Sequence, residues 1–201
     1  MSTYPAAALI LSAAHARQFP LDNGVEVAFA GRSNSGKSSA INAITGQRAL
    51  ARTSKTPGRT RLLNFFLLAP GCRIVDLPGY GYAEASAAER ATWAPMTTVL
   101  ATRESLRGLF LMIDSRRGVL EGDDGLIEWA QSAGCAVHVL FTKVDKLRRS
   151  ELASALALAR RTLGARATVQ AFSAHDSTGL DEARRQLHQW FKKPVKGPGG
   201  L

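Results

Sequence analysis

The chain has 201 residues, of which 45% are hydrophobic and 21% are charged. These values are typical of one globular domain, and they exclude wholesale disorder, a collagen-like repeat and a disulfide-stabilised scaffold. Lysine and arginine outnumber aspartate and glutamate by 26 to 16, which gives a formal net charge of +10. Such a charge favours a polyanionic partner, nucleic acid first and an acidic membrane second.

Two cysteines and one apolar run indicate the cellular compartment in which the protein acts. Cys72 and Cys135 stand in separate apolar stretches without metal-ligand spacing, which indicates buried, reduced thiols. The longest apolar run, 6–14, is far shorter than the roughly 20 residues that a membrane helix needs. The same run imitates a signal peptide but lacks a preceding basic segment. We expect a cytoplasmic protein without a membrane span, and keep the signal peptide as the alternative.

Apolar extended runs alternate with segments of helical spacing, and their order predicts the fold. Strands are expected at 25–30, 62–68, 73–75, 109–113, 136–141 and 168–172, and helices at 38–44, 125–133, 150–163 and 181–191. The second and third strands are joined by too short a connection for a crossover and must pair antiparallel. The alternation predicts an α/β fold: a mostly parallel, six-stranded sheet with one antiparallel strand and helices on both faces.

The rest of the chain is assigned around this domain. Residues 1–22 are expected to form an N-terminal extension packed on it, and residues 23–191 form the domain itself. The segment 192–201 is rich in Gly, Pro and Lys, which predicts a flexible basic tail.

A phosphate-binding motif follows the first predicted strand. Residues 31–38 read GRSNSGKS and fit G-x-x-x-x-G-K-[ST], with a strand before and a helix after the loop, as the motif requires. Its glycines allow successive N–H groups to face a phosphate, Lys37 can reach the β- and γ-phosphates, and Ser38 can offer its hydroxyl to Mg²⁺. The alternative is a plain turn with an exposed lysine. The expected nucleotide contacts here are Gly31, Arg32, Ser33, Asn34, Ser35, Gly36, Lys37, Ser38 and Ser39.

A second motif, D-x-x-G, follows the predicted strand at 73–75. Asp76 can hold Mg²⁺ through water, and the amide of Gly79 can bond the γ-phosphate and so sense its loss. Alone, this motif is a common turn signal. After a phosphate-binding loop, we interpret it as the second half of the same site.

A third group of residues follows the later strands, where the carboxyl ends of parallel strands build a ligand crevice. Asp145 can accept two hydrogens from the Watson–Crick edge of guanine, whereas adenine would leave it unpaired. Lys143 can lay its aliphatic stem over the base. The pair Ser173-Ala174 can supply a backbone N–H to guanine O6.

In this order, the motifs resemble those of the translation-factor-related (Era-like) P-loop GTPases. The segments GRSNSGKSS, TPGRTRLLNFF, DLPGYGYA and FTKVDKL are similar to the EngB/YsxC (YihA) family of bacterial ribosome-biogenesis GTP-binding proteins, and the resemblance covers about 11–191. It implies a Ras-like G domain that hydrolyses GTP slowly and acts in assembly of the large ribosomal subunit, with rRNA and ribosomal proteins as partners. It also implies a cytoplasmic monomer with a link to cell division.

The resemblance also assigns metal ligands and one substitution. Ser38 and Thr60 would be the side-chain ligands of Mg²⁺, with Thr60 arriving when the loop 52–61 closes over the γ-phosphate. The alternative is that this loop is a plain solvated connection. Thr142 stands where related GTPases usually carry asparagine, which we expect to remove one amide contact to the phosphate-binding loop.

For hydrolysis, we expect Lys37, Thr60, Gly79 and Asn34 to contribute. Tyr80 stands where Ras-like enzymes carry the glutamine that orients water, which predicts slow turnover. Asn34 matches the asparagine by which related GTPases hold K⁺, so potassium-stimulated hydrolysis is a hypothesis.

Two other functions stay open. One is an RNA-binding chaperone with nucleotide as a structural ligand, and the other is a P-loop kinase or ATPase, against which Asp145 argues.

Basic residues of the last third of the chain are interpreted as one rRNA-facing surface, with solvated helix faces as the alternative. These are Arg148, Arg149, Arg160, Arg161, Arg166, Arg184, Arg185, Lys192 and Lys193.

Overall fold

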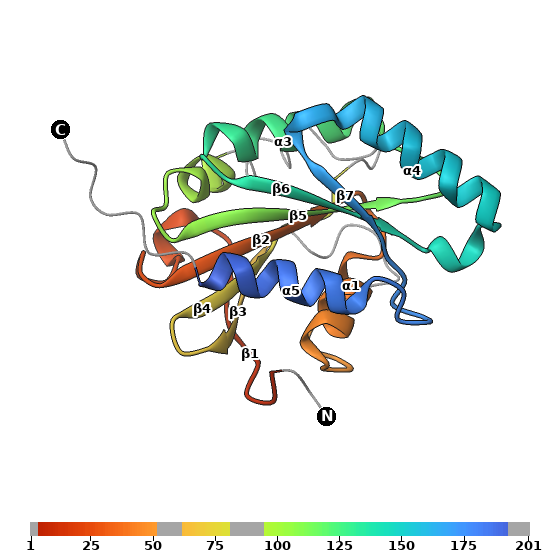
Figure 1. Cartoon of the computed structure of the whole chain (residues 1–201). Coiled ribbons are helices and arrows are strands. Elements are labelled where there is room, and N and C mark those ends of the chain that lie inside the picture. The colour runs from red at the N-terminus through yellow and green to blue at the C-terminus, as the bar shows by residue number, and fades with distance from the viewer. Residues whose placement is uncertain (1–3, 52–61, 81–94, 193–201) are drawn as a thin grey trace.

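A seven-stranded sheet forms the centre of the computed structural model, which describes residues 4–51, 62–80 and 95–192 (Figure 1). The strand order is β1-β3-β4-β2-β5-β6-β7. Only β3 runs antiparallel to its neighbours, as the short connection to β4 requires. The strands are β1 (Ala8–Ala13), β2 (Val25–Gly31), β3 (Leu63–Ala69), β4 (Cys72–Asp76), β5 (Leu106–Asp114), β6 (Ala136–Thr142) and β7 (Thr168–Ala171).

Helices cover both faces of the sheet. In Figure 1, α1 and α5 lie together on one face, and α3 and α4 lie on the other. Residues 95–101 are also helical. The mostly parallel α/β fold with helices on both faces is therefore confirmed. The four labelled helices are α1 (Lys37–Thr45), α3 (Glu121–Ser132), α4 (Arg149–Leu163) and α5 (Leu180–Phe191), and the short 3-10 turns are η1 (Ala16–Gln18), η2 (Val144–Lys146) and η3 (Gly164–Arg166).

The core consists of two apolar layers, one on each side of the sheet. Every residue of the central strands β2 and β5 is buried, as expected for parallel strands covered on both faces. Trp190 of α5 packs directly on Gly108 of β5, where an added Cβ would lie 2.6 Å from the indole ring. The tryptophan is thus a core anchor.

The sheet has one strand more than the six predicted. The apolar run at 6–14 contains β1, which pairs antiparallel with β3 at the edge of the sheet. Its two exposed apolar side chains, Leu9 and Ile10, break the polar-apolar alternation by which an edge strand is usually recognised. The division into an extension at 1–22, a domain at 23–191 and a basic tail stays a prediction, and 193–201 lie outside the described residues.

Two smaller expectations are corrected. Helix α3 begins at Glu121, before the predicted residue 125, because the Asp123 carboxylate accepts a hydrogen bond from the Leu120 N–H at 2.8 Å and caps the first turn. Both cysteines are free thiols and Cys135 is buried, but Cys72 is only half-buried because it opens β4 beside a turn. Among the described residues, no helix is both long and apolar enough to cross a membrane.

A buried ionic cluster closes the end of the sheet opposite the loops that carry the motifs. Glu26 of β2 is fully buried, and its carboxylate accepts hydrogen bonds from Arg73 Nε at 2.9 Å, Arg103 Nε at 2.7 Å and Ser105 Oγ at 2.9 Å. The two guanidinium groups also bond the Leu21 carbonyl at 3.0 and 3.1 Å. This cluster ties β2, β4 and the start of β5 to the chain that precedes β2.

Candidate functional site

The phosphate-binding loop joins β2 to α1 and has the backbone that its glycines predict. Gly36 immediately precedes α1 with φ 92°, and Asn34 lies in the left-handed region at φ 62°. Gly36 places no side chain over the first turn of α1, where backbone N–H groups have no partner within the helix. An exposed helix N-terminus of this kind favours an anion.

Position 31 requires glycine because of close packing, and not because of a positive φ angle. A Cβ on this residue would lie 2.4 Å from Ser35 Oγ and 2.8 Å from the backbone oxygen of Met112. The loop therefore folds back over its own first residue and rests on β5. Only glycine allows this approach without displacing the backbone of β5.

Lys37 and Asp76 meet, although 38 residues separate them in the sequence. The Lys37 ammonium forms an ion pair with the Asp76 carboxylate at the end of β4, and both side chains are largely buried, with 11% and 6% exposed. The loop and the D-x-x-G motif thus form one site, as interpreted from their order. Ser38 and Ser39 lie in the first turn of α1, whereas Thr60 lies outside the described residues.

The D-x-x-G segment docks on the phosphate-binding loop. Ser33 N–H donates to the Tyr80 carbonyl at 2.9 Å, and Tyr80 N–H approaches the Gly31 carbonyl at 3.4 Å. A Cβ on Gly79 would lie 3.1 Å from Ser33 Oγ, so the two segments are in van der Waals contact. Gly79 is therefore next to the loop whose phosphate it is expected to sense.

Thr142 contacts the loop through its hydroxyl, in place of the asparagine amide contact that we expect this residue to remove. Its hydroxyl donates to the Ser35 carbonyl at 2.6 Å and lies 3.1 Å from the Ile113 carbonyl. A hydroxyl on the buried end of β6 thus ties the loop to the sheet without an asparagine amide.

Lys143 braces the loop from the next position. Its Nζ donates to the Asn34 carbonyl at 2.5 Å and lies 3.0 Å from Asp114 Oδ2. Burial raises the pKa of Asp114, but hydrogen bonds from Arg116 and Lys143 outweigh it and hold this pKa well below its usual range. Sequence reasoning missed Asp114. A carboxylate at the end of β5, on the same edge as the other motifs, was the available signal.

Asp145 is held as an ionised acceptor. Ser173 Oγ donates to Asp145 Oδ1 at 2.8 Å, and Lys146 Nζ lies 3.0 Å from Oδ2. The Ser173 hydroxyl, followed by Lys146, lowers the pKa of the Asp145 carboxyl. Ser173 N–H donates to the Thr178 carbonyl at 3.0 Å, so within the predicted pair the N–H for guanine O6 would come from Ala174.

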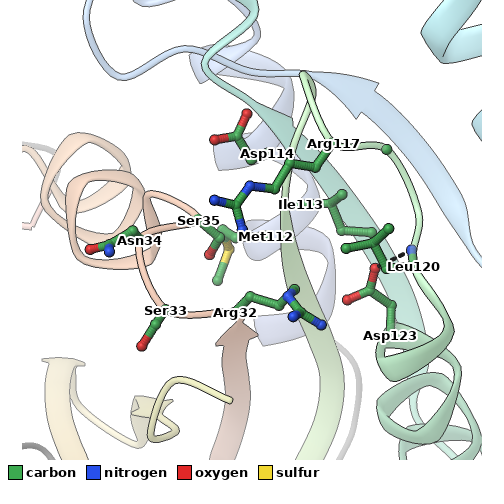
Figure 2. Close-up of a pocket in the computed structure, with 11 residues that line it drawn as sticks. Arg32, Ser33, Asn34, Ser35, Met112, Ile113, Asp114, Arg117, Leu120 and Asp123 are labelled. Atoms are coloured by element: carbon green, nitrogen blue, oxygen red, sulfur yellow. Dashed lines mark hydrogen bonds between the residues drawn. The ribbon is translucent and has the colours of Figure 1, made fainter. Parts of the chain in front are cut away.

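A hollow lies beside the loop, between it and the segment that leads from β5 to α3. Figure 2 shows Arg32 extending from the loop on the side of Asp123 of α3, and Arg117 extending from the segment after β5. Asp123 was also missed by sequence reasoning. The lining residues are Arg32, Ser33, Asn34, Ser35, Met112, Ile113, Asp114, Arg117, Gly118, Leu120 and Asp123.

The basic residues of the last third do not gather on one face. Helices α4 and α5, which carry most of them, cover opposite faces of the sheet (Figure 1). Arg184 is used within the fold, where its guanidinium donates to the Ile44 and Ala43 carbonyls at the end of α1, both at 3.0 Å. Arg166 pairs with Asp124 at 2.8 Å. The expected single rRNA-facing surface is therefore divided, and Lys193 lies outside the described residues.

Comparisons with known proteins agree with these motifs. Residues 26–143 match the family model described as "50S ribosome-binding GTPase". Proteins named "Probable GTP-binding protein EngB" are 46% identical over 193 residues in Coxiella burnetii, covering 94% of each chain. The relative of that name in Stenotrophomonas maltophilia is 48% identical over 186 residues, covering 90% of this chain and 93% of the relative.

Solved structures share the fold. The crystal structure of a probable GTP-binding protein engB matches with a TM-score of 0.64 at 20% identity, covering 85% of this chain and 100% of that one. Era in complex with MgGDPNP and nucleotides 1506–1542 of 16S ribosomal RNA matches with a TM-score of 0.65 at 21% identity, covering 89% and 60%. The sequence relatives extend over nearly the whole length, and the chain belongs to the EngB family of GTP-binding proteins and is a P-loop GTPase.

Proposed function

We propose that this chain is a slow GTPase switch that acts in assembly of the bacterial large ribosomal subunit. The observation that carries the proposal is the match of 26–143 to the family described as "50S ribosome-binding GTPase". The net charge of +10 supports a ribosomal partner, because rRNA phosphates are the polyanion that a cytoplasmic protein meets most often. A monomer in the cytoplasm is part of the same proposal, and a link to cell division stays a prediction.

The nucleotide would lie along the edge formed by the ends of β2, β4, β5 and β6. Its phosphates would meet the loop amides and Lys37, and guanine would meet Asp145, whose lowered pKa keeps it an acceptor. The Lys37–Asp76 ion pair would open, because the phosphates compete for the lysine. Asp145 would then select guanine over adenine, which offers a lone pair where guanine offers an N–H.

The residues present fit a magnesium ion. Mg²⁺ keeps several waters and takes few protein ligands besides nucleotide phosphates, and the described residues hold no group of three or more His, Cys, Asp or Glu side chains that would bind a metal alone. Ser38 would ligate the ion directly and Asp76 through water. Thr60 is proposed as a further ligand from outside the described residues. The ion supplies charge neutralisation between the β- and γ-phosphates.

Slow hydrolysis follows from the position of Tyr80, whose hydroxyl donates to Asp123 of α3. A phenol held in this way does not orient a water as glutamine does. We propose that K⁺ bound at Asn34 contributes in place of an arginine finger. Hydrolysis rates in matched KCl and NaCl series test this point, and equal rates at every concentration would exclude it.

The proposed function is tested by binding to ribosomal particles. Protein loaded with GDP or a non-hydrolysable GTP analogue is sedimented with precursors of the large subunit over a salt series, since non-specific electrostatic binding falls steeply with salt. A switch predicts that one nucleotide state binds more tightly at every salt concentration. Equal binding in both states would favour the alternative, an RNA-binding chaperone with nucleotide as a structural ligand.

A further inference from the structure

Tyr80, immediately after the D-x-x-G motif, is fixed at three points. Its carbonyl accepts from Ser33 N–H at 2.9 Å, its N–H approaches the Gly31 carbonyl, and its hydroxyl donates to Asp123 of α3. The ring also lies under the Arg32 guanidinium, 5.9 Å from its centroid. Burial, followed by the Asp123 carboxylate, raises the pKa of the phenol, so the hydroxyl keeps the proton it donates.

Asp123 is a buried, fixed acceptor for this hydroxyl. The residue is 1% exposed, and its two carboxylate oxygens have different partners. Oδ1 accepts from Tyr80, whereas Oδ2 accepts from Leu120 N–H at 2.8 Å and caps α3. The tyrosine is therefore anchored to the rigid start of a helix and not to a surface side chain.

These bonds would compete with γ-phosphate binding. Ser33 N–H is among the loop donors expected to face the phosphates, and here Tyr80 already uses it. Gly79 is the residue whose amide would turn toward the γ-phosphate. Its neighbour Tyr80 is held through its backbone N–H, its carbonyl and its side-chain hydroxyl. A movement of Gly79 that carried Tyr80 with it would break or strain these contacts.

We propose that Tyr80 and Asp123 form a latch that weakens binding of GTP relative to GDP. The latch stabilises the arrangement in which Gly79 packs on Ser33, and binding of the γ-phosphate has to overcome it. GDP has no γ-phosphate and leaves the latch closed. The pair acts as positioning residues, and the inference rests on the proposed role of Gly79 in sensing the γ-phosphate.

The first test compares Tyr80→Phe with Tyr4→Phe. Tyr4 is buried and Tyr80 is partly buried, but the Tyr4 hydroxyl has no hydrogen-bond partner among the described residues, so its removal controls for the loss of a phenol oxygen. Dissociation constants for GDP and a non-hydrolysable GTP analogue are measured by titration. Tyr80→Phe should raise the affinity for the GTP analogue relative to GDP by about tenfold, as expected for loss of a hydrogen bond to a charged group. Tyr4→Phe should leave the ratio unchanged.

A second variant tests the partner. Asp123→Asn removes the charge and puts an NH2 donor in place of one of the two oxygens that accept from Tyr80 and Leu120, so this variant should shift the ratio in the same direction. If the two residues act through one bond, the double variant should shift the ratio no further than the larger single shift. Thermal melting of each variant identifies any loss of folding.

The outcomes separate the latch from the proposed switch. An unchanged affinity ratio in Tyr80→Phe, or equal losses for both nucleotides, overturns the latch. Additive shifts in the double variant overturn the pairing of Tyr80 with Asp123. Failure of the wild-type chain to hydrolyse GTP would count against the proposed switch itself, whatever the ratio does.

Discussion

Replacement of Gly31 by alanine tests the geometry of the phosphate-binding loop. The added Cβ would lie 2.4 Å from Ser35 Oγ and 2.8 Å from the Met112 backbone oxygen. The serine side chain can rotate, but the backbone of β5 cannot move aside cheaply, so the loop itself must shift. Overpacking of this kind costs about 1–3 kcal/mol. If this cost is borne by the loop in its nucleotide-bound form, GDP affinity should fall by roughly 5- to 150-fold.

The matched control is Gly125→Ala. This glycine lies exposed in α3, and a Cβ there meets nothing within 4 Å. The control should bind GDP normally and be more stable by up to about 1 kcal/mol, because alanine is the better helix former. Titration with a fluorescent GDP analogue and thermal melting are measured for both variants. Unchanged GDP affinity and melting temperature in Gly31→Ala would refute the close packing of Gly31 against Ser35 and Met112.

Three other changes follow from the same contacts. Thr142→Val leaves the Ser35 carbonyl without its buried donor, which should cost about 1–3 kcal/mol, and GDP titration should show weaker binding, whereas Thr142→Ser should bind as the wild type does. Glu26→Gln removes a fully buried charge that holds two guanidinium groups, and urea unfolding should show a loss of about 3–5 kcal/mol. The exposed Glu104→Gln should change stability by less than about 0.5 kcal/mol, and equal losses would contradict the role of the cluster. Asp114→Asn removes the charge beside Lys143, and stopped-flow measurements should show faster release of GDP.

The sequence predicts the parts of the site whose chemistry is local. The phosphate-binding loop, D-x-x-G and T-K-x-D are each read from residues a few positions apart, because each depends on one turn at the end of one strand. Their assembly also follows from the sequence, since the carboxyl ends of parallel strands meet at one edge.

What the sequence does not predict depends on contacts between distant elements. Asp123 is an ordinary acidic residue in a helix until the fold brings Tyr80 to it, and Asp114 supports Lys143 only because β5 and β6 are neighbours. Strand β1 is missed for a similar reason, since an apolar run without alternation becomes a strand only when an edge, here β3, is present to pair with it. Pairing partners of this kind are tertiary information.

Nucleotide specificity is the decisive test of the guanine site. Affinities of the purified chain for GDP, a non-hydrolysable GTP analogue and ATP are measured beside those of Asp145→Asn for guanine and xanthine nucleotides. We expect guanine binding favoured over ATP by a factor on the order of 10⁴, and a change of preference to xanthine in the variant. Comparable affinity for ATP, or an Asp145→Asn variant that still prefers guanine, would contradict the guanine site that Asp145 and Ser173 are proposed to form.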